Sequence, residues 1–102
     1  MEQNLKVKNE LEPPSSLSAN IGEKEGEIEL HWDPVDGANS YAIELSRNGK
    51  KLKWQMIDIV GSSKHTVTGL KVSTAYCFRV SALDSKHQGP WSETVMKKLL
   101  KQ

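Results

Sequence analysis

Residues 67–82 read V-T-G-L-K-V-S-T-A-Y-C-F-R-V-S-A, and this stretch decides the fold. In its second half, apolar residues fall on every second position and form one set: Tyr76, Phe78, Val80 and Ala82. The residues between them form the other set: Cys77, Arg79 and Ser81. Strict alternation over this length is typical of a half-buried strand in an antiparallel sheet. The stretch therefore predicts the central strand of a small β-sandwich, with the second set facing outward.

Shorter runs of the same kind flank this strand and are separated by turn residues. We expect strands at residues 15–21, 27–32, 40–47, 50–59 and 64–68, and a last strand that begins near Trp91. No segment of helical length has a 3.6-residue period. Short strands with turn signals about every 8–12 residues are typical of a sandwich. The predicted fold is all-β, a seven-stranded antiparallel sandwich with sheets of three and four strands and a core of Trp32, Tyr41, Leu70, Tyr76 and Phe78.

Three local features refine this arrangement. Both residues 13–14 are proline and lack an N–H, so the strand at residues 15–21 is predicted at a sheet edge. Residues 48–49 are Asn-Gly, which favours a type I′ hairpin turn. In the strand that follows, the apolar positions change parity between Met56 and Ile57, which predicts a β-bulge at an edge.

Length and charge bound the possible classes of protein. The chain has 102 residues, which is the size of one domain, and its formal net charge is +1. This balance gives no general attraction to nucleic acid or to an anionic membrane, so neither is an expected partner. We expect an arm or linker at residues 1–12 (with a short helix as the alternative), one domain at 13–99 and a tail at 100–102. The expected state is a monomer.

The compartment stays open at this point. The chain has no apolar run near the roughly 18 residues that indicate a membrane span, and its first residues are polar, unlike a signal peptide. The chain is therefore either intracellular or a domain excised from a secreted or surface protein.

A family resemblance rests on several short motifs that occur in order. They are Pro14, Leu30-x-Trp32-x-Pro34, Tyr41-x-Ile43, Thr68-Gly69-Leu70, Thr74-x-Tyr76, Val80-x-Ala82 and Gly89-Pro90-x-Ser92. In this order and spacing the chain resembles a fibronectin type III domain over residues 13–99. The resemblance implies an immunoglobulin-like sandwich and a tyrosine corner, in which the Tyr76 hydroxyl bonds backbone a few residues upstream. Val72 departs from the family, which commonly has proline at this position. Parts of the sequence are similar to bacterial members of the family.

The outward set of the central strand and its neighbours supply the candidate interface. Its members are Glu44, Trp54, Cys77, Arg79 and Trp91, together with Ala42 and the loop at residues 84–90. Trp91 is expected to pack beside Arg79, because cationic and aromatic side chains stack. Cys77 is the single cysteine, so its alternatives are an incidental thiol or redox or intermolecular pairing.

The residues do not point to catalysis or to a cofactor. The three histidines lie on different elements and lack ligand spacing, so no metal site is expected. There is no G-x-S-x-G motif, and a sandwich of short strands offers no enclosed pocket for chemistry. We expect no enzyme activity, no catalytic residue and no cofactor.

Three functions remain, in order of preference. The first is a protein–protein interaction or adhesion module with a partner of unknown identity. The second is a passive spacer within a longer modular protein, such as a surface protein or a carbohydrate-active enzyme. The third is weak polyanion or glycan binding through the lysines near the hairpin, Lys50, Lys51, Lys53 and Lys64. Lysines on an edge strand also guard against aggregation, which is the plainer reading of this cluster.

Overall fold

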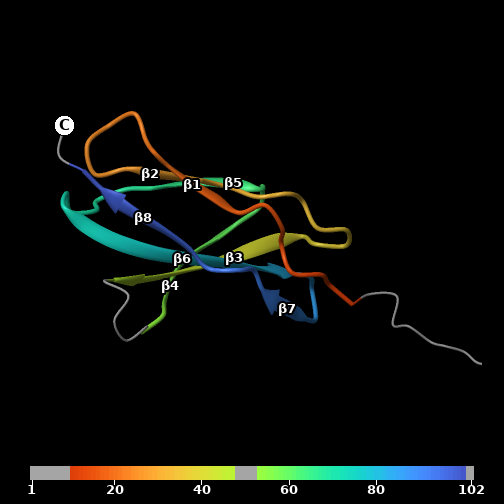
Figure 1. Ribbon diagram of the computed structural model, residues 1–102. Helices are drawn as coiled ribbons and strands as arrows, with labels where there is room; N and C mark the ends of the chain where they lie inside the picture. Colours follow the sequence, from red (N-terminus) through yellow and green to blue (C-terminus); the bar gives the residue numbers. More distant parts are fainter. Residues whose placement is uncertain (1–9, 48–52, 101–102) are drawn as a thin grey trace, which may run out of the picture.

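The computed structural model describes residues 10–47 and 53–100, and these form eight strands and no helix (Figure 1). The strands are β1 (Ser18–Ile21), β2 (Ile28–His31), β3 (Ser40–Arg47), β4 (Gln55–Val60), β5 (Lys64–Val67), β6 (Thr74–Leu83), β7 (Gln88–Trp91) and β8 (Val95–Leu99). The two predicted residues of the hairpin turn, 48–49, lie outside the described part of the chain.

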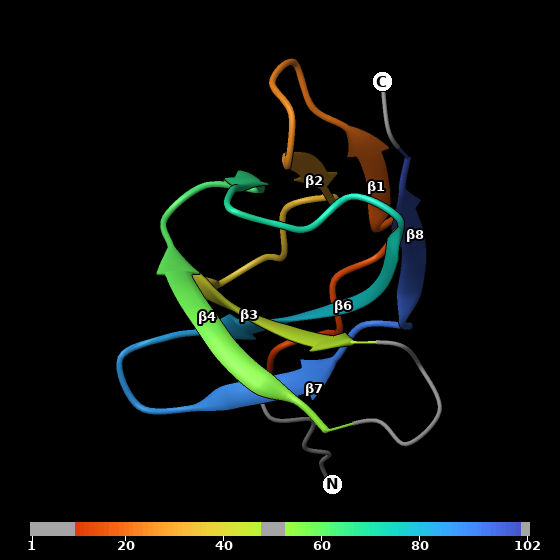
Figure 2. The ribbon, with the colours of Figure 1, turned by 90° about the vertical axis from the view of Figure 1, so that its left-hand side faces the viewer.

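The strands form two antiparallel sheets that face each other (Figure 2). The smaller sheet has the order β1-β2-β5, and the larger has the order β4-β3-β6-β7, with β8 also paired to β6. Strand β6 pairs with β3 along one edge and with β7 and then β8 along the other. The predicted all-β sandwich with β6 at its centre is thus confirmed, although it has eight strands instead of seven and the larger sheet has five instead of four.

The extra strand arises because the predicted last strand is divided at Ser92. The part before the break pairs Trp91 with Ser81, and the part after it pairs Val95 with Phe78. At the break, the Ser92 hydroxyl accepts a hydrogen bond from the Val80 N–H (3.0 Å), and the Ser92 N–H donates to the Val80 carbonyl (2.7 Å). A side chain thereby replaces one backbone group of the ladder. The division also places residues 88–90 in β7, where a loop was expected.

A cluster of buried apolar side chains fills the space between the sheets. Trp32, Tyr41, Tyr76 and Phe78 are all buried there. The Trp32 and Tyr41 rings meet edge to face at 5.3 Å, a favoured aromatic geometry. Leu70 differs from expectation because it is only half-buried and packs against the margin of this cluster. It belongs to the turn before β6 and not to a strand, so it closes one end of the core.

Both core tyrosines bond backbone with their hydroxyls. The Tyr76 hydroxyl accepts a hydrogen bond from the Lys71 N–H at 2.8 Å, the bond that the tyrosine corner implies. The Tyr41 hydroxyl accepts one from the Val35 N–H at 2.9 Å, which the sequence did not indicate. Each bond satisfies a loop donor that would otherwise be costly to bury.

The edge strands agree with the sequence. Strand β1 lies at an edge of the smaller sheet, after the two prolines. Strand β4 lies at an edge of the larger sheet, where Ile43 pairs with Asp58 but Glu44 pairs with Met56. Ile57 is therefore the extra residue of a bulge, as its parity predicted.

One core residue precedes the predicted start of the domain at residue 13. Leu11, which the sequence placed in the arm, is only 5% exposed and belongs to the core cluster. It packs so close to Gly89 that a Cβ at Gly89 would lie 2.8 Å from the Leu11 Cβ. A single leucine among charged residues carries no periodicity, so this contact could not be predicted from the sequence.

The burial of Leu11 generates a stability prediction. We expect Leu11→Ala to lower the free energy of unfolding by about 2–4 kcal/mol, because it removes buried methyl groups and leaves a cavity. Glu12→Ala, next to it and exposed, should change stability by less than about 0.5 kcal/mol. Urea denaturation of both variants measures the difference. Equal stabilities would mean that residue 11 is outside the domain.

Candidate functional site

The outer face of the larger sheet carries a stack of three side chains, Trp54, Arg79 and Trp91. The Arg79 guanidinium carbon lies 4.3 Å from the Trp54 ring centroid and 4.4 Å from the Trp91 ring centroid. These distances are well within the range of a cation–π interaction. Trp54 comes from the segment before β4, and Trp91 ends β7, so the stack joins segments that flank β6 on both sides. The expected packing of Trp91 beside Arg79 is present.

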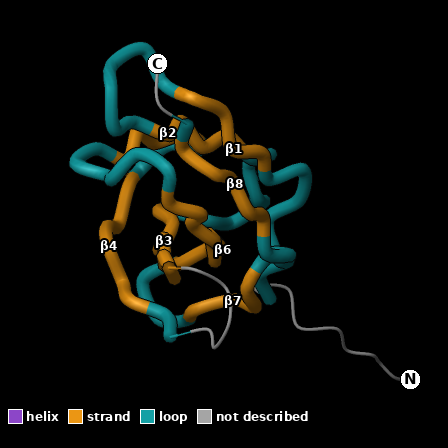
Figure 3. Tube along the Cα trace, turned by 60° about the vertical axis from the view of Figure 1, so that its left-hand side comes forward, coloured by secondary structure: helices purple, strands orange, loops and turns teal. Residues whose placement is uncertain are grey.

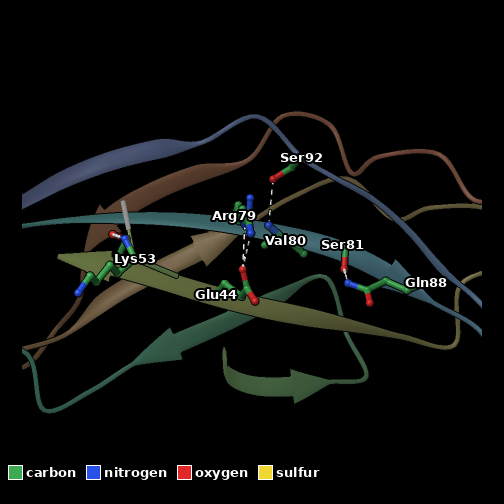
Figure 4. Close-up of polar contacts among 8 residues, drawn as sticks. Glu44, Lys53, Arg79, Val80, Ser81, Gln88 and Ser92 are labelled. Atoms are coloured by element: carbon green, nitrogen blue, oxygen red, sulfur yellow. Dashed lines mark hydrogen bonds and ion pairs between the residues drawn. The ribbon is translucent and has the colours of Figure 1, made fainter. Parts of the chain in front are cut away.

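Glu44 completes this arrangement from β3. It is the register partner of Arg79, so both side chains project from the same face (Figure 4). The Arg79 Nε and Nη2 atoms lie 2.9 and 2.7 Å from the Glu44 Oε1 atom. The ion pair neutralises a cation that is largely covered by the two rings, which lowers the cost of burying it.

Two further hydrogen bonds cover the rest of this face. The Gln88 side-chain amide donates to the Ser81 hydroxyl at 2.8 Å, and the Lys53 N–H donates to the Ser46 hydroxyl at 3.1 Å (Figure 4). Ser46 and Ser81 are both buried. Polar groups at the centre of this sheet are thus bonded within the chain.

The expectation that Cys77 and Ala42 form an exposed surface is wrong. Cys77 is only 6% exposed and Ala42 only 1%. Both are small side chains in the middle of a wide sheet. Larger side chains on neighbouring strands, such as Met96, the β8 partner of Cys77, shield them from solvent. A buried thiol is poorly placed for redox chemistry or intermolecular pairing.

Exposed apolar side chains lie on this same outer face, on strands β4 and β8. In the described residues, the exposed large hydrophobic side chains are Met56, Ile59, Met96 and Leu100. The cross-strand partners of Met56, Ile59 and Met96 are Glu44, Ala42 and Cys77, all on the outer face. Leu100 shares the parity of Met96 and continues this set past the end of β8.

The smaller sheet presents a contrasting outer face. Its outward register positions, opposite the buried Ile28 and Leu30, are all polar: Ser18, Asn20, Glu29, His31, Lys64 and Thr66. The sandwich therefore has one polar face and one face with exposed apolar side chains. In the sequence, Met56 indicates only the bulge, and neither Ile59 nor Met96 is marked as a surface residue. That these apolar residues share one exposed face follows only from the pairing of adjacent strands, which the pattern within one strand does not reveal.

Groups that could support chemistry are dispersed. The part of the chain that the structure describes holds no cluster of three metal-ligating side chains. The histidines pair separately with Glu29, Asp58 and Asp84 at 3.8, 3.4 and 3.4 Å. No helix among the described residues has the length and apolar character needed to cross a membrane.

Asp84 organises the turn between β6 and β7. Its Oδ1 atom accepts hydrogen bonds from the N–H groups of Lys86 (2.8 Å) and His87 (2.6 Å). These backbone hydrogen bonds favour the charged form and lower the pKa of Asp84 from its ordinary value of 3.8, and the charge of His87 adds to the effect.

The two-sheet antiparallel topology and the tyrosine corner define an immunoglobulin-like β-sandwich module. The chain belongs to the fibronectin type III family, whose model matches residues 12–98. The Fn3-like protein from Clostridium thermocellum is 27% identical with a TM-score of 0.75, over 87% of this chain and 93% of that one. The chicken CNTN1 FN1–FN3 structure is 26% identical with a TM-score of 0.77, over 88% of this chain and 31% of that one.

Curated relatives are far longer than this chain. The sortilin-related receptor of Oryctolagus cuniculus is 34% identical over an alignment of 86 residues that covers 79% of this chain. The receptor-type tyrosine-protein phosphatase F of Mus musculus is 33% identical over an alignment of 70 residues that covers 67% of this chain. The match spans 4% of each relative. The family occurs as modular units in receptors and other multidomain proteins, and its fold is a non-catalytic module. Animal and clostridial proteins both match, so the bacterial resemblance stays a prediction.

The stack generates a second stability prediction. Arg79→Lys should lower the free energy of unfolding by about 1–2 kcal/mol, since lysine can neither stack flat on two rings nor make both bonds to Glu44. It should also weaken the near-ultraviolet circular dichroism of the tryptophans. Arg47→Lys, at the exposed end of β3, is the matched control and should be nearly neutral. Equal stability of the two variants would show that the stack does not hold the face together.

The lowered pKa of Asp84 generates a pH prediction. Because the folded-state pKa is below the ordinary value, the carboxylate stabilises its turn above about pH 4, and this contribution is lost as the pH falls through the lowered pKa. In an NMR titration, the Lys86 and His87 amide shifts should move with a midpoint below 3.8. In Asp84→Asn this transition should be absent. A midpoint at or above 3.8 would contradict the assignment.

Proposed function

We propose that this chain is a non-catalytic module that binds a partner protein through the outer face of its larger sheet. The observation that carries the proposal is the placement of Met56, Ile59 and Met96 on one face while the opposite face is polar. Single exposed apolar residues are normal on a protein surface, but a group of them on one face is typical of an interaction site. The module acts by contact and not by chemistry.

The stack makes this face rigid. Trp54 and Trp91 are half-buried and Arg79 is tied to Glu44, so these side chains lose little conformational freedom when a partner arrives. Tryptophan and arginine are also enriched among the residues that dominate binding energy at interfaces. The exposed Met56 and Ile59 lie one strand away, beside Glu44 and Ala42. Fixed rings beside flexible apolar side chains make this face suitable for binding the surface of another protein.

The partner is proposed to dock on the face and not to add a strand to the edge. Strand β4 has a bulge at Ile57, and Asp58 occupies a position paired with the buried Ile43. Bulges and charged side chains at inward positions are devices that protect a sheet edge from pairing. The free edge of β4 is therefore a poor template for another strand.

A spacer is the second candidate function. The chain matches only 4% of each curated relative, and both relatives are large proteins in which one module could serve to separate others. A spacer would have no need of the apolar face. Polyanion binding has less support, because the two described lysines of the predicted cluster lie apart: Lys53 precedes β4 and Lys64 lies on the smaller sheet.

The test compares two double variants on opposite faces. The tagged domain, Met56→Glu/Ile59→Glu and the control Asn20→Glu/Thr66→Glu are used to capture proteins from the source lysate. We expect a specific protein to be retained by the wild type and the control. Its recovery with Met56→Glu/Ile59→Glu should fall by at least about tenfold, the equivalent of about 1.4 kcal/mol. If all three folded forms retain the same background, the spacer function is favoured.

A further inference from the structure

A groove of about 460 Å³ opens beside Trp91. Its lining comes from the segment before β1 and from residues around the break between β7 and β8. Figure 3 shows how these two segments, far apart in the sequence, run in the fold. Pro13, Pro14 and Leu17 supply apolar lining from one side, and Trp91, Glu93 and Thr94 line the other. Its volume falls within the range of about 300–1,000 Å³ that is typical of ligand sites.

The charge of the groove is negative. Among the described residues that line it, Glu93 is the one charged residue and none is a lysine or an arginine. Glu93 is exposed and makes no ion pair with the described residues. The carboxylate of Asp33 lies next to the lining of the groove. Its Oδ2 atom accepts a hydrogen bond at 3.4 Å from the hydroxyl of Ser15, another lining residue. A chain with a net charge of +1 thus has a local site that attracts a cation.

Trp91 adds a surface for stacking. The Arg79 guanidinium carbon lies 4.4 Å from its ring centroid, and Trp91 lines the groove whereas Arg79 does not. The stack of Trp54, Arg79 and Trp91 therefore ends at the groove. An aromatic ring attracts a cation at either face. Glu44 neutralises Arg79 through two hydrogen bonds, which reduces its repulsion of a second cation beyond Trp91.

We propose that this groove binds an arginine side chain of a partner protein. The guanidinium lies between the Trp91 ring and the Glu93 carboxylate, and the methylene stem lies along Pro13, Pro14 and Leu17. Arginine fits this chemistry better than lysine, because its planar group stacks on rings and pairs with a carboxylate through two N–H groups. Long cationic side chains also bury their stems along apolar surface. The groove adjoins the outer face of the larger sheet at Trp91 but is not lined by Met56 or Ile59, so neither proposal depends on the other.

The experiment titrates the ¹⁵N-labelled domain with the tripeptide acetyl-Gly-Arg-Gly-amide. The matched control ligand replaces arginine by citrulline, which has the same shape and no charge. We expect saturable shifts of the Trp91 indole N–H and of the Glu93 and Thr94 amides, with a dissociation constant in the millimolar range. The citrulline peptide should bind at least about tenfold more weakly, since both cation–π attraction and the ion pair are lost.

Two variants locate the site. Glu93→Gln should weaken binding of the arginine peptide about fivefold, the effect of an exposed ion pair worth about 1 kcal/mol. Glu29→Gln, which removes a carboxylate from the outer face of the smaller sheet, should leave binding unchanged. Equal binding of both peptides, or unchanged binding by Glu93→Gln, would overturn the proposal. Loss of peptide binding in the folded Met56→Glu/Ile59→Glu variant would also overturn it, because the peptide would then be binding to the apolar face.

Discussion

Strand β6 imposes the constraint on which the rest of the sandwich depends. Its backbone groups need partners along both edges, and its side chains are covered on both faces. On the inner face of β6, apolar side chains are covered because they pack into the core between the sheets. The outer face of β6 is covered in a different way, because Arg79 occupies the centre of that face. A charge there must be neutralised and shielded, and Glu44 and the two tryptophans do both.

This solution decides where the domain presents apolar surface. The centre of the outer face is occupied by bonded polar groups and by the stack, so exposed apolar side chains are left at its margins, on β4 and β8. The stack also ties the segment before β4 to the end of β7 across β6. This outer face accordingly has a rigid centre and exposed apolar side chains at its margins.

Local periodicity and turn chemistry were sufficient to predict the sandwich, its central strand and the bulge at Ile57. Three features escaped prediction because they depend on contacts between distant residues. Leu11 has no apolar neighbour in sequence, yet it packs beside Gly89. Cys77 alternates like an outward residue, but a wide sheet covers it. The break at Ser92 depends on one hydroxyl bonding to Val80. Alternation indicates direction within a strand, while exposure depends on what lies over that strand.

The placement of the last strand has a mechanical consequence. Strand β8 lies beside β1, and the two ends of the described chain emerge at opposite ends of the sandwich (Figures 1 and 2). Tension applied through neighbouring domains would run along β8 and load its hydrogen bonds with β6 in parallel. Bonds loaded in shear must break together, whereas bonds at a peeling edge break one after another. A module of this shape would resist extension when it is linked in series.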